Sequence, residues 1–217
     1  MIYHKENTFE YFSKYITWND TDHILNFGGN SGNLIRSSEG KIKQEHYTCA
    51  DVDMQAMTEG LAAFPNATWI HYNRFNPIYN IGGKNELPNL PRSYNLICSY
   101  SVFLHMSYRD TIEILNFLWK VLEPGGKIFF SWCNVDDERT VNLFKDWNKI
   151  EDDLPEVDDY LYLVDNKVQL VGPFYPKRTF VCMYKKDFLL KALSKFNPVS
   201  HLPPRNWFQE CMELTKL

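Results

Sequence analysis

The sequence predicts an α/β fold with a mainly parallel sheet. Two observations carry this prediction: short apolar segments recur along the chain, and segments with helical spacing of apolar residues separate them. Strands that alternate with helices form βαβ units, and the strands of such units are parallel. A third observation is the length of 217 residues with 44% hydrophobic content, which is sufficient for one domain with a packed core.

The first half of the chain is expected to contain a short N-terminal helix, three strands and a helix after the second strand. The strands are buried apolar runs, and the third is rich in β-branched and aromatic residues. We expect the first helix from Asn7-Thr8 to Ile16, the strands at 23–27, 47–52 and 67–72, and the second helix near 54–64. The polar segment from Asn73 to about Arg92 is rich in glycine, proline and asparagine and is expected to be a loop.

A fourth strand at 94–100 is followed by a helix whose two ends are marked in the sequence. Ser107 and Asp110 form a capping-box pattern at its start, and Glu123-Pro124-Gly125-Gly126 ends it because proline and glycine terminate helices. A fifth strand is expected at 127–132, after which the alternation is interrupted. The remaining elements are an insertion at 134–183 with a hairpin at 160–171, a helix near 184–196 and two strands near 198–202 and 207–214.

Charge and cysteine content argue against several functions. The net charge of −4 disfavours a general nucleic-acid binder. The five cysteines are widely spaced, without a Cys-x-x-Cys pair or a Cys/His cluster, so we expect a reduced, intracellular protein and no metal site. The N-terminus has no apolar core of signal-peptide length, and no later run approaches ~18 apolar residues. The expected location is therefore the cytoplasm, with no membrane contact.

A glycine-rich turn follows the first strand, in the stretch NFGGNSG at 26–32. In parallel sheets of this kind, ligands bind at the carboxyl ends of the strands, where the strand order reverses. That rule brings the turn, Asp51, Asn73 and the segment 99–101 to one edge of the sheet. We expect these residues to contact a single ligand.

The spacing of the glycines distinguishes between ligand classes. The dinucleotide pattern G-x-G-x-x-G requires glycine at positions 28, 30 and 33, but Asn30 and Asn33 stand at two of them. A G-x-G-x-G pattern requires glycine at 28, 30 and 32, and only Asn30 departs from it. Asparagine is one of the few residues with a side chain that tolerate a positive φ, so the turn can persist. A Walker phosphate loop is excluded because no Gly-Lys-Ser/Thr follows.

With these motifs in order, the chain resembles the seven-strand, class I methyltransferases that depend on S-adenosylmethionine (SAM). The resemblance rests on NFGGNSG at 26–32, where the family usually has D-x-G-x-G-x-G, on YTCADVD at 47–53, on YNLICSYSVFLH at 94–105 and on LWKVLEPGG at 118–126. It implies a Rossmann-like three-layer sandwich, whose mainly parallel seven-stranded sheet has an antiparallel last strand. It further implies a single domain at 1–217, with a helix or lid at 1–20 and an acceptor-binding insertion at 134–183 after the fifth strand.

The resemblance also implies SAM as cofactor, S-adenosylhomocysteine (SAH) as product, and a set of cofactor-binding residues. These residues are Asn26, Gly28, Gly29, Asn30, Gly32, Asp51, Val52, Asn73, Ser99 and Tyr100. Gly28 and Gly32 let the backbone approach the ligand, and Asp51 can accept hydrogen bonds from both ribose hydroxyls. Asn73 would accept a bond from the adenine amino group, or else cap its loop. Asn26 replaces the family's acid, which predicts weaker binding of the cationic cofactor rather than none.

His105 follows the fourth strand, near the expected position of the methyl group, and is the first candidate for a catalytic base or acceptor-orienting residue. The alternative is a partly buried structural histidine. Tyr100 is a weaker catalytic candidate. Asn76-Pro77-Ile78-Tyr79 is similar to the motif of adenine-amino methyltransferases, but it follows the third strand instead of the fourth, so DNA is not the expected acceptor.

Further side chains are candidates for contacts with the acceptor. The candidates for a lid are Tyr3, Tyr11 and Tyr15, although helix packing explains them too. The candidates for an apolar acceptor pocket are Tyr160, Tyr162, Phe174 and Tyr175, which core packing of the hairpin explains equally well. The candidates for binding an acceptor carboxylate are Arg74, Lys177 and Arg178.

We therefore expect a methyltransferase for a small-molecule or short-peptide acceptor, with O-methylation of a carboxylate or hydroxyl in specialised metabolism. Two alternatives stay open. Asn26, Asn30, Asn73 and Asn95 would suit a non-catalytic scaffold or partner protein with this fold. A nicotinamide-dependent oxidoreductase is disfavoured by the glycine spacing and by the absence of a paired Tyr-x-x-x-Lys pattern. The oligomeric state is left open.

Overall fold

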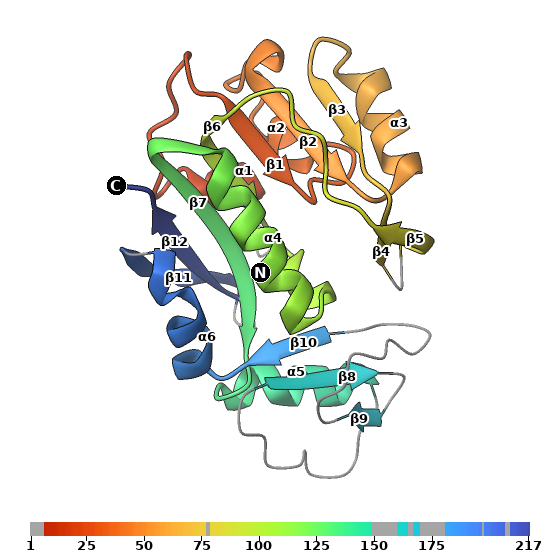
Figure 1. Cartoon of the computed structure of the whole chain (residues 1–217), viewed down its shortest axis with the longest axis vertical. Coiled ribbons are helices and arrows are strands. Elements are labelled where there is room, and N and C mark those ends of the chain that lie inside the picture. The colour runs from red at the N-terminus through yellow and green to blue at the C-terminus, as the bar shows by residue number, and fades with distance from the viewer. Residues whose placement is uncertain are drawn as a thin grey trace, which may run out of the picture.

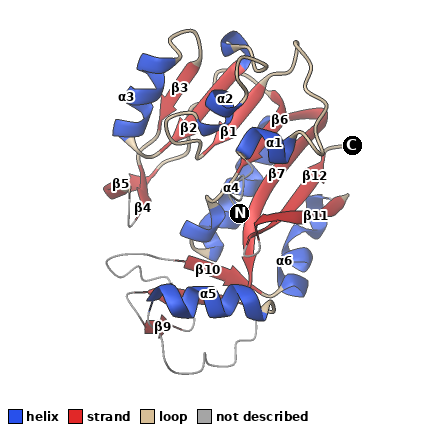
Figure 2. Cartoon of the chain, turned by 180° about the vertical axis from the view of Figure 1, so that it is seen from behind, coloured by secondary structure: helices blue, strands red, loops and turns tan. Residues whose placement is uncertain are grey.

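The fold is a mixed sheet with helices on both faces, seen from opposite sides in Figures 1 and 2. It is given by a computed structural model that describes residues 7–76, 79–148, 160–164, 167–169, 181–196, 198–206 and 209–217. One hydrophobic cluster lies between the sheet and helices α4 and α6, and a second lies between the sheet and helices α1, α2 and α3. This is the three-layer sandwich that the sequence predicts.

The main sheet has the strand order β3-β2-β1-β6-β7, continued by β12 and β11. The strands are β1 (Ile24–Phe27), β2 (Tyr47–Asp51), β3 (Thr68–His71), β6 (Tyr94–Ser99), β7 (Leu122–Asn134), β11 (Val199–Asn206) and β12 (Gln209–Thr215). The first five are parallel to their neighbours, whereas β12 is antiparallel to β7 and to β11. The mainly parallel seven-stranded sheet with an antiparallel last strand is confirmed. The strand order reverses between β1 and β6.

Strand β7 has two sets of partners. Its central part pairs with β6 and β12, while Cys133 and Asn134 at its end pair with β10. The additional strands are β8 (Tyr160–Val164), β9 (Lys167–Gln169) and β10 (Val181–Tyr184). Strands β8 and β9 are antiparallel, with Val164 opposite Lys167, in agreement with the hairpin predicted there; residues 165, 166, 170 and 171 lie outside the described residues.

The helices begin at caps that the sequence provides. Ser107 caps α4 by accepting a hydrogen bond from the backbone N–H of Asp110, and the carboxylate of Asp110 accepts one from the Ser107 hydroxyl. Asn7 and Glu10 form a capping box at α1, which is shorter than predicted and ends at Phe12 instead of near Ile16. The helices are α1 (Thr8–Phe12), α2 (Asn33–Ser37), α3 (Met54–Ala63), α4 (Tyr108–Val121), α5 (Glu138–Asn148) and α6 (Lys186–Leu193), with 3₁₀ turns η1 (Gln44–His46), η2 (Phe103–His105) and η3 (Ser194–Phe196).

The prediction of a loop from Asn73 to Arg92 is wrong in part, because a separate two-stranded sheet occupies its first half. This hairpin is formed by β4 (Arg74–Asn76) and β5 (Asn80–Asn85). Gly83 permits it, since a Cβ there would lie 2.5 Å from the backbone of Arg74. The strand pattern was missed because β5 is polar and glycine-rich, without alternating apolar residues.

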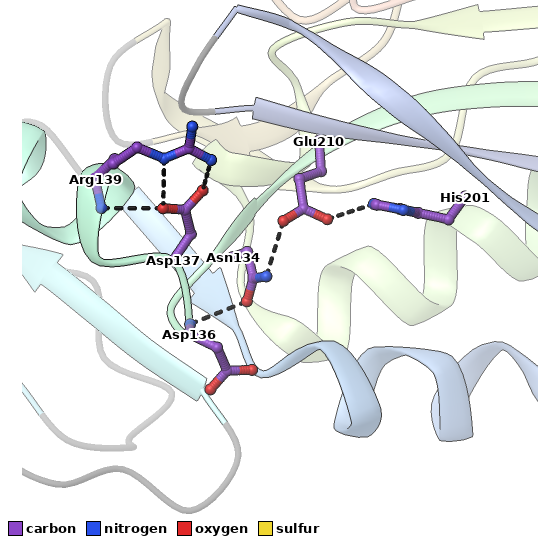
Figure 3. Close-up of polar contacts among 6 residues, drawn as sticks. All are labelled: Asn134, Asp136, Asp137, Arg139, His201 and Glu210. Carbon is purple, nitrogen blue, oxygen red and sulfur yellow. Dashed lines mark hydrogen bonds and ion pairs between the residues drawn. The ribbon is translucent and has the colours of Figure 1, made fainter.

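A polar cluster fixes the end of β7 to the last strands (Figure 3). The Asn134 amide donates to one carboxylate oxygen of Glu210 at 2.8 Å, and the other oxygen pairs with His201. The side-chain oxygen of Asn134 accepts a hydrogen bond from the backbone N–H of Asp136 at 3.0 Å. The cluster therefore joins the first residues of the insertion to β11 and β12.

Candidate functional site

Two adjoining cavities open at the carboxyl ends of β1, β2 and β6, beside the reversal of strand order. The first cavity is lined by Gly28, Asn30, Asn33, Asp51, Val52, Tyr72, Arg74, Phe75, Asn76, Tyr79, Tyr100, Ser101, Val102, His105, Met106 and Asp110. The second is lined by Asn7, Thr8, Asn26, Gly28, Gly29, Asn33, Leu34, Arg36, Ser37, Tyr100 and Ser101. They meet at Gly28, Asn33, Tyr100 and Ser101. Segments far apart in the chain therefore converge on the edge that the sequence predicts.

The glycine-rich turn has the backbone conformation that its sequence pattern requires. Gly28, Asn30 and Gly32 have φ values of 67°, 52° and 89°. A Cβ on Gly28 would lie 2.2 Å from Val102 Cγ2, so this position is closed to side chains. The Asn30 side-chain oxygen accepts a hydrogen bond from the backbone N–H of Ser31 at 2.8 Å, which holds the left-handed residue. The prediction that Asn30 can take the conformation of glycine is confirmed.

Asp51 is one of two acids that line the first cavity, the other being Asp110. Asp51 ends β2 and is only 8% exposed. One carboxylate oxygen accepts the N–H of Asn30 at 2.7 Å, and the other accepts the N–H of Asp53 at 3.0 Å. Burial raises the pKa of the Asp51 carboxyl, and these hydrogen bonds lower it only in part. Asp53, by contrast, caps α3 through the backbone N–H groups of Gln55 and Ala56.

Asn26 lies beneath the glycine turn and lines the second cavity. Its amide donates a hydrogen bond to the Tyr47 hydroxyl at 2.9 Å in a buried position. A Cβ on Gly29 would come within 2.4 Å of this amide, so the turn rests directly on Asn26. Cys49 also contacts the turn, because its thiol donates to the Asn30 carbonyl oxygen at 3.5 Å. Burial raises the pKa of the Cys49 thiol.

The segment after β6 forms the facing wall. Tyr100 lines both cavities, and its ring packs against Tyr11 and Phe12 at centroid distances of 6.1 and 6.4 Å. His105 ends η2 and lines the first cavity, with its ring 6.4 Å from that of Tyr79 in an edge-on arrangement. The hydroxyl of Ser99 is fully buried and has no partner among the described residues, and Ser99 is not among the residues that line either cavity.

Several predicted site residues lie elsewhere. Asn73 is not among the residues that line the cavities, and its side-chain oxygen accepts a hydrogen bond from Asn80 at 3.3 Å. Gly32 is the residue before α2 and does not line either cavity. Tyr11 is buried, and its hydroxyl donates to the Pro203 carbonyl oxygen at 2.8 Å, so it packs in the core and forms no lid. Tyr3, Phe174, Tyr175, Lys177 and Arg178, as well as the side chains of Tyr160 and Tyr162, lie outside the described residues.

The β4–β5 hairpin supplies cavity residues that the sequence did not identify, among them Phe75 and Tyr79. Arg74 of this hairpin was expected to bind an acceptor carboxylate. Instead its guanidinium, 3% exposed, pairs with Asp110 and, at 2.6 Å, with Glu113 of α4. The two carboxylates carry two negative charges against the one positive charge of Arg74, and Asp51 adds a third carboxylate. The wall of the first cavity is therefore net negative and suits a cationic ligand.

The chain matches known proteins over this region. Residues 25–128 match the model of the family described as Methyltransferase domain. The glycopeptide N-methyltransferase MtfA complexed with SAH has 13% sequence identity and a TM-score of 0.58, over 96% of this chain and 85% of that one. Magnesium protoporphyrin IX methyltransferase from Synechocystis PCC 6803 with bound SAH has 10% identity and a TM-score of 0.55, over 90% and 74%. A SAM-dependent methyltransferase from Clostridium acetobutylicum ATCC 824 has 15% identity and a TM-score of 0.55, over 89% and 83%. At these identities the likeness is one of fold.

Proposed function

We propose that the chain is a class I, SAM-dependent methyltransferase, which the match of residues 25–128 to a methyltransferase domain supports, and that it transfers the methyl group to a hydroxyl oxygen of a small-molecule or short-peptide acceptor. The observation that carries the proposal is the convergence on one cavity of the glycine turn, Asp51 and the segment after β6. These elements also lie where the strand order reverses, the usual ligand position in such sheets.

The described residues fit SAM. In the proposed arrangement, Asp51 accepts the ribose hydroxyls, since each carboxylate oxygen has a second lone pair beyond its bond to a backbone N–H. Val52 lies beside the adenine, while Asn26 and Gly29 line the adjoining cavity for the methionine part. Ser99 takes part through its backbone, because its hydroxyl is buried. Asn73 has no place in the proposal, since its side chain is bonded to Asn80.

Charge supports a cationic cofactor despite the loss of the family's acid at Asn26. SAM supplies an electrophilic methyl group on a positively charged sulfur. Asp51 and Asp110 line the cavity, and the single charge of Arg74 is shared between Asp110 and Glu113. The remaining negative charge attracts the cofactor through a partly buried, low-dielectric site. We therefore expect Asn26 to lower the affinity and to leave the choice of cofactor unchanged.

His105 is the proposed base. It lines the first cavity after β6, and a hydroxyl acceptor must lose its proton as its oxygen takes the methyl group. A carboxylate acceptor needs no base, but it would enter a cavity lined by Asp51 and Asp110. The charge of Arg74 does not offset both, because Arg74 already pairs with Asp110. This repulsion favours a hydroxyl over a carboxylate. Tyr100 is proposed to shape the wall, because its ring packs on α1.

An amine acceptor is the second candidate, because the same carboxylates attract a cation. The glycopeptide N-methyltransferase among the structural matches is a precedent for a peptide acceptor. We propose that residues 134–183 cap the acceptor and that residues 1–20 cover the methionine side, which the position of Asn7 and Thr8 at the second cavity supports. Five free, buried cysteines support a reducing compartment, and we propose the cytoplasm and a role in specialised metabolism. Within the described residues, no helix is both long and apolar enough to cross a membrane.

A thermal-shift panel tests the cofactor assignment. SAM and SAH are expected to raise the Tm and NAD to leave it unchanged, because only ligands of the native state stabilise it. Asp51→Asn is expected to abolish the shift. Asp53→Asn is the matched control, since asparagine caps helices as well as aspartate does, and it is expected to retain the shift. Stabilisation by NAD alone would refute the proposal, and stabilisation by none of the three would favour the scaffold.

A further inference from the structure

Ser101 has an unusual backbone conformation for a residue with a side chain. It lies two residues beyond β6 and has a φ of 59°. Residues with a Cβ adopt this left-handed conformation only where the surrounding structure enforces it, and such positions concentrate at binding and catalytic sites.

Buried side chains from two other strands hold Ser101 at both its backbone and its hydroxyl. The N–H of Ser101 donates to the Ser131 hydroxyl of β7 at 2.7 Å. The Gln209 amide of β12 donates to the Ser101 hydroxyl oxygen at 2.7 Å, and its carbonyl oxygen accepts from Ser131 at 2.7 Å. Gln209 is 3% exposed and Ser131 is fully buried. Residue 101 is therefore fixed by partners that come from distant parts of the chain.

The side chain stands where the two cavities meet. Ser101 is one of the four residues that line both, together with Gly28, Asn33 and Tyr100. Under the proposed function, on which this inference rests, the adenosine part of SAM lies in the first cavity and the methionine part in the second. The sulfonium joins these two parts, so the residues at the junction flank the sulfur and its methyl group.

We infer that Ser101 is a positioning residue for the transferred methyl group. A hydroxyl oxygen has two acceptor lone pairs, and the Gln209 amide takes one of them. The other can accept a polarised C–H of the sulfonium methyl. Because Gln209 and Ser131 fix the hydroxyl, this contact sets the direction in which the methyl group points and hence the line along which the acceptor must approach.

The test uses two SAM analogues and needs no knowledge of the acceptor. Sinefungin carries an amino group where SAM carries the methyl group, whereas SAH carries nothing there. In isothermal titration calorimetry of the full chain, we expect sinefungin to bind about 10-fold or more tightly than SAH, because an ammonium group forms a charge-assisted hydrogen bond with the hydroxyl. Ser101→Gly and Ser101→Ala are expected to reduce this preference about 10-fold and to keep the Kd of SAH within about twofold.

The pair of substitutions separates the hydroxyl from the backbone. Glycine adopts a positive φ without strain, whereas alanine keeps the Cβ and therefore the strain of the native residue. Loss of the hydroxyl affects both variants equally, whereas a change in backbone strain affects only the glycine variant. Ser200→Ala, at an exposed position of β11, is the control and is expected to keep the wild-type preference. The inference is overturned if the wild type shows no preference for sinefungin, if Ser101→Gly retains it, or if the variants lose SAH as well. Wild-type protein that binds neither analogue would instead refute the proposed function.

Discussion

Asn30 offers a quantitative test of how a glycine-type turn persists without its central glycine. Two changes are compared: Asn30→Ala keeps a Cβ but removes the amide, and Asn30→Gly removes both. The native residue has a φ of 52°, and its side-chain oxygen accepts the N–H of Ser31 at 2.8 Å. The two substitutions therefore separate the steric cost of the left-handed conformation from the hydrogen bond that offsets it.

In the glycine variant the two effects have opposite signs, whereas the alanine variant loses the hydrogen bond and keeps the steric cost that Asn30 already carries. Loss of the hydrogen bond costs about 1 kcal/mol of unfolding free energy. A Cβ in the left-handed region costs roughly 1 kcal/mol, which asparagine and alanine both carry and glycine avoids. Asn30→Ala is thus expected to destabilise the protein by about 1 kcal/mol, and Asn30→Gly to stay within about 0.5 kcal/mol of the wild type.

Thermal unfolding of the ligand-free protein measures the difference. At about 2–4 °C per kcal/mol for a domain of this size, the Tm is expected to fall by about 2–4 °C in Asn30→Ala and by no more than about 2 °C in Asn30→Gly. Asn66→Ala is a control, because Asn66 is exposed and lacks a positive φ, and its Tm should be unchanged. Equal Tm values for the alanine variant and the wild type, or equal losses for alanine and glycine, would refute the reasoning.

Three further predictions concern the site and its support. Burial raises the pKa of Asp51, so between its unfolded-state and native-state pKa values the native state binds more protons than the unfolded state. The stability of the ligand-free protein, measured in denaturant titrations, should therefore fall as the pH rises through that window. Asp51→Asn should remove this pH dependence and abolish SAH binding. His105→Ala should lower kcat about 100-fold or more once an acceptor is known and leave SAH affinity unchanged; full activity would show that His105 is not the base. Gly60→Ala gains about 1 kcal/mol of helix propensity but places a Cβ 2.2 Å from the Trp69 ring, where overpacking costs about 1–3 kcal/mol, so the Tm should fall. A rise in Tm would mean that the ring moves away freely.

The elements of the main sheet were predictable because local patterns determine them. Apolar runs gave the parallel strands, the capping box at Ser107 gave the start of α4, and the glycine spacing gave the turn at Asn30. The β4–β5 hairpin was not predictable in this way, since β5 contains glycines and polar residues in place of alternating apolar ones. Its existence depends on the close approach that Gly83 permits.

The site was predictable only as far as it follows the carboxyl ends of the strands. Asp51 and the segment after β6 were placed on the correct edge for this reason. The pairing of Arg74 with Asp110 joins residues 36 positions apart, and the contact of Ser101 with Gln209 joins residues 108 positions apart. No local pattern encodes such contacts, because they depend on how the hairpin, α4 and β12 pack in three dimensions.

The buried cysteines allow opening of the glycine-rich turn to be followed by chemical labelling of their thiols. Alkylating reagents attack an accessible thiolate, and Cys49 has neither access to solvent nor an easily formed thiolate while it contacts the Asn30 carbonyl. The labelling rate of Cys49 therefore reports how often the glycine-rich turn separates from β2, and a ligand that stabilises the closed turn lowers that rate. The other four cysteines are also buried, and their thiols provide the reference for global unfolding in the same sample.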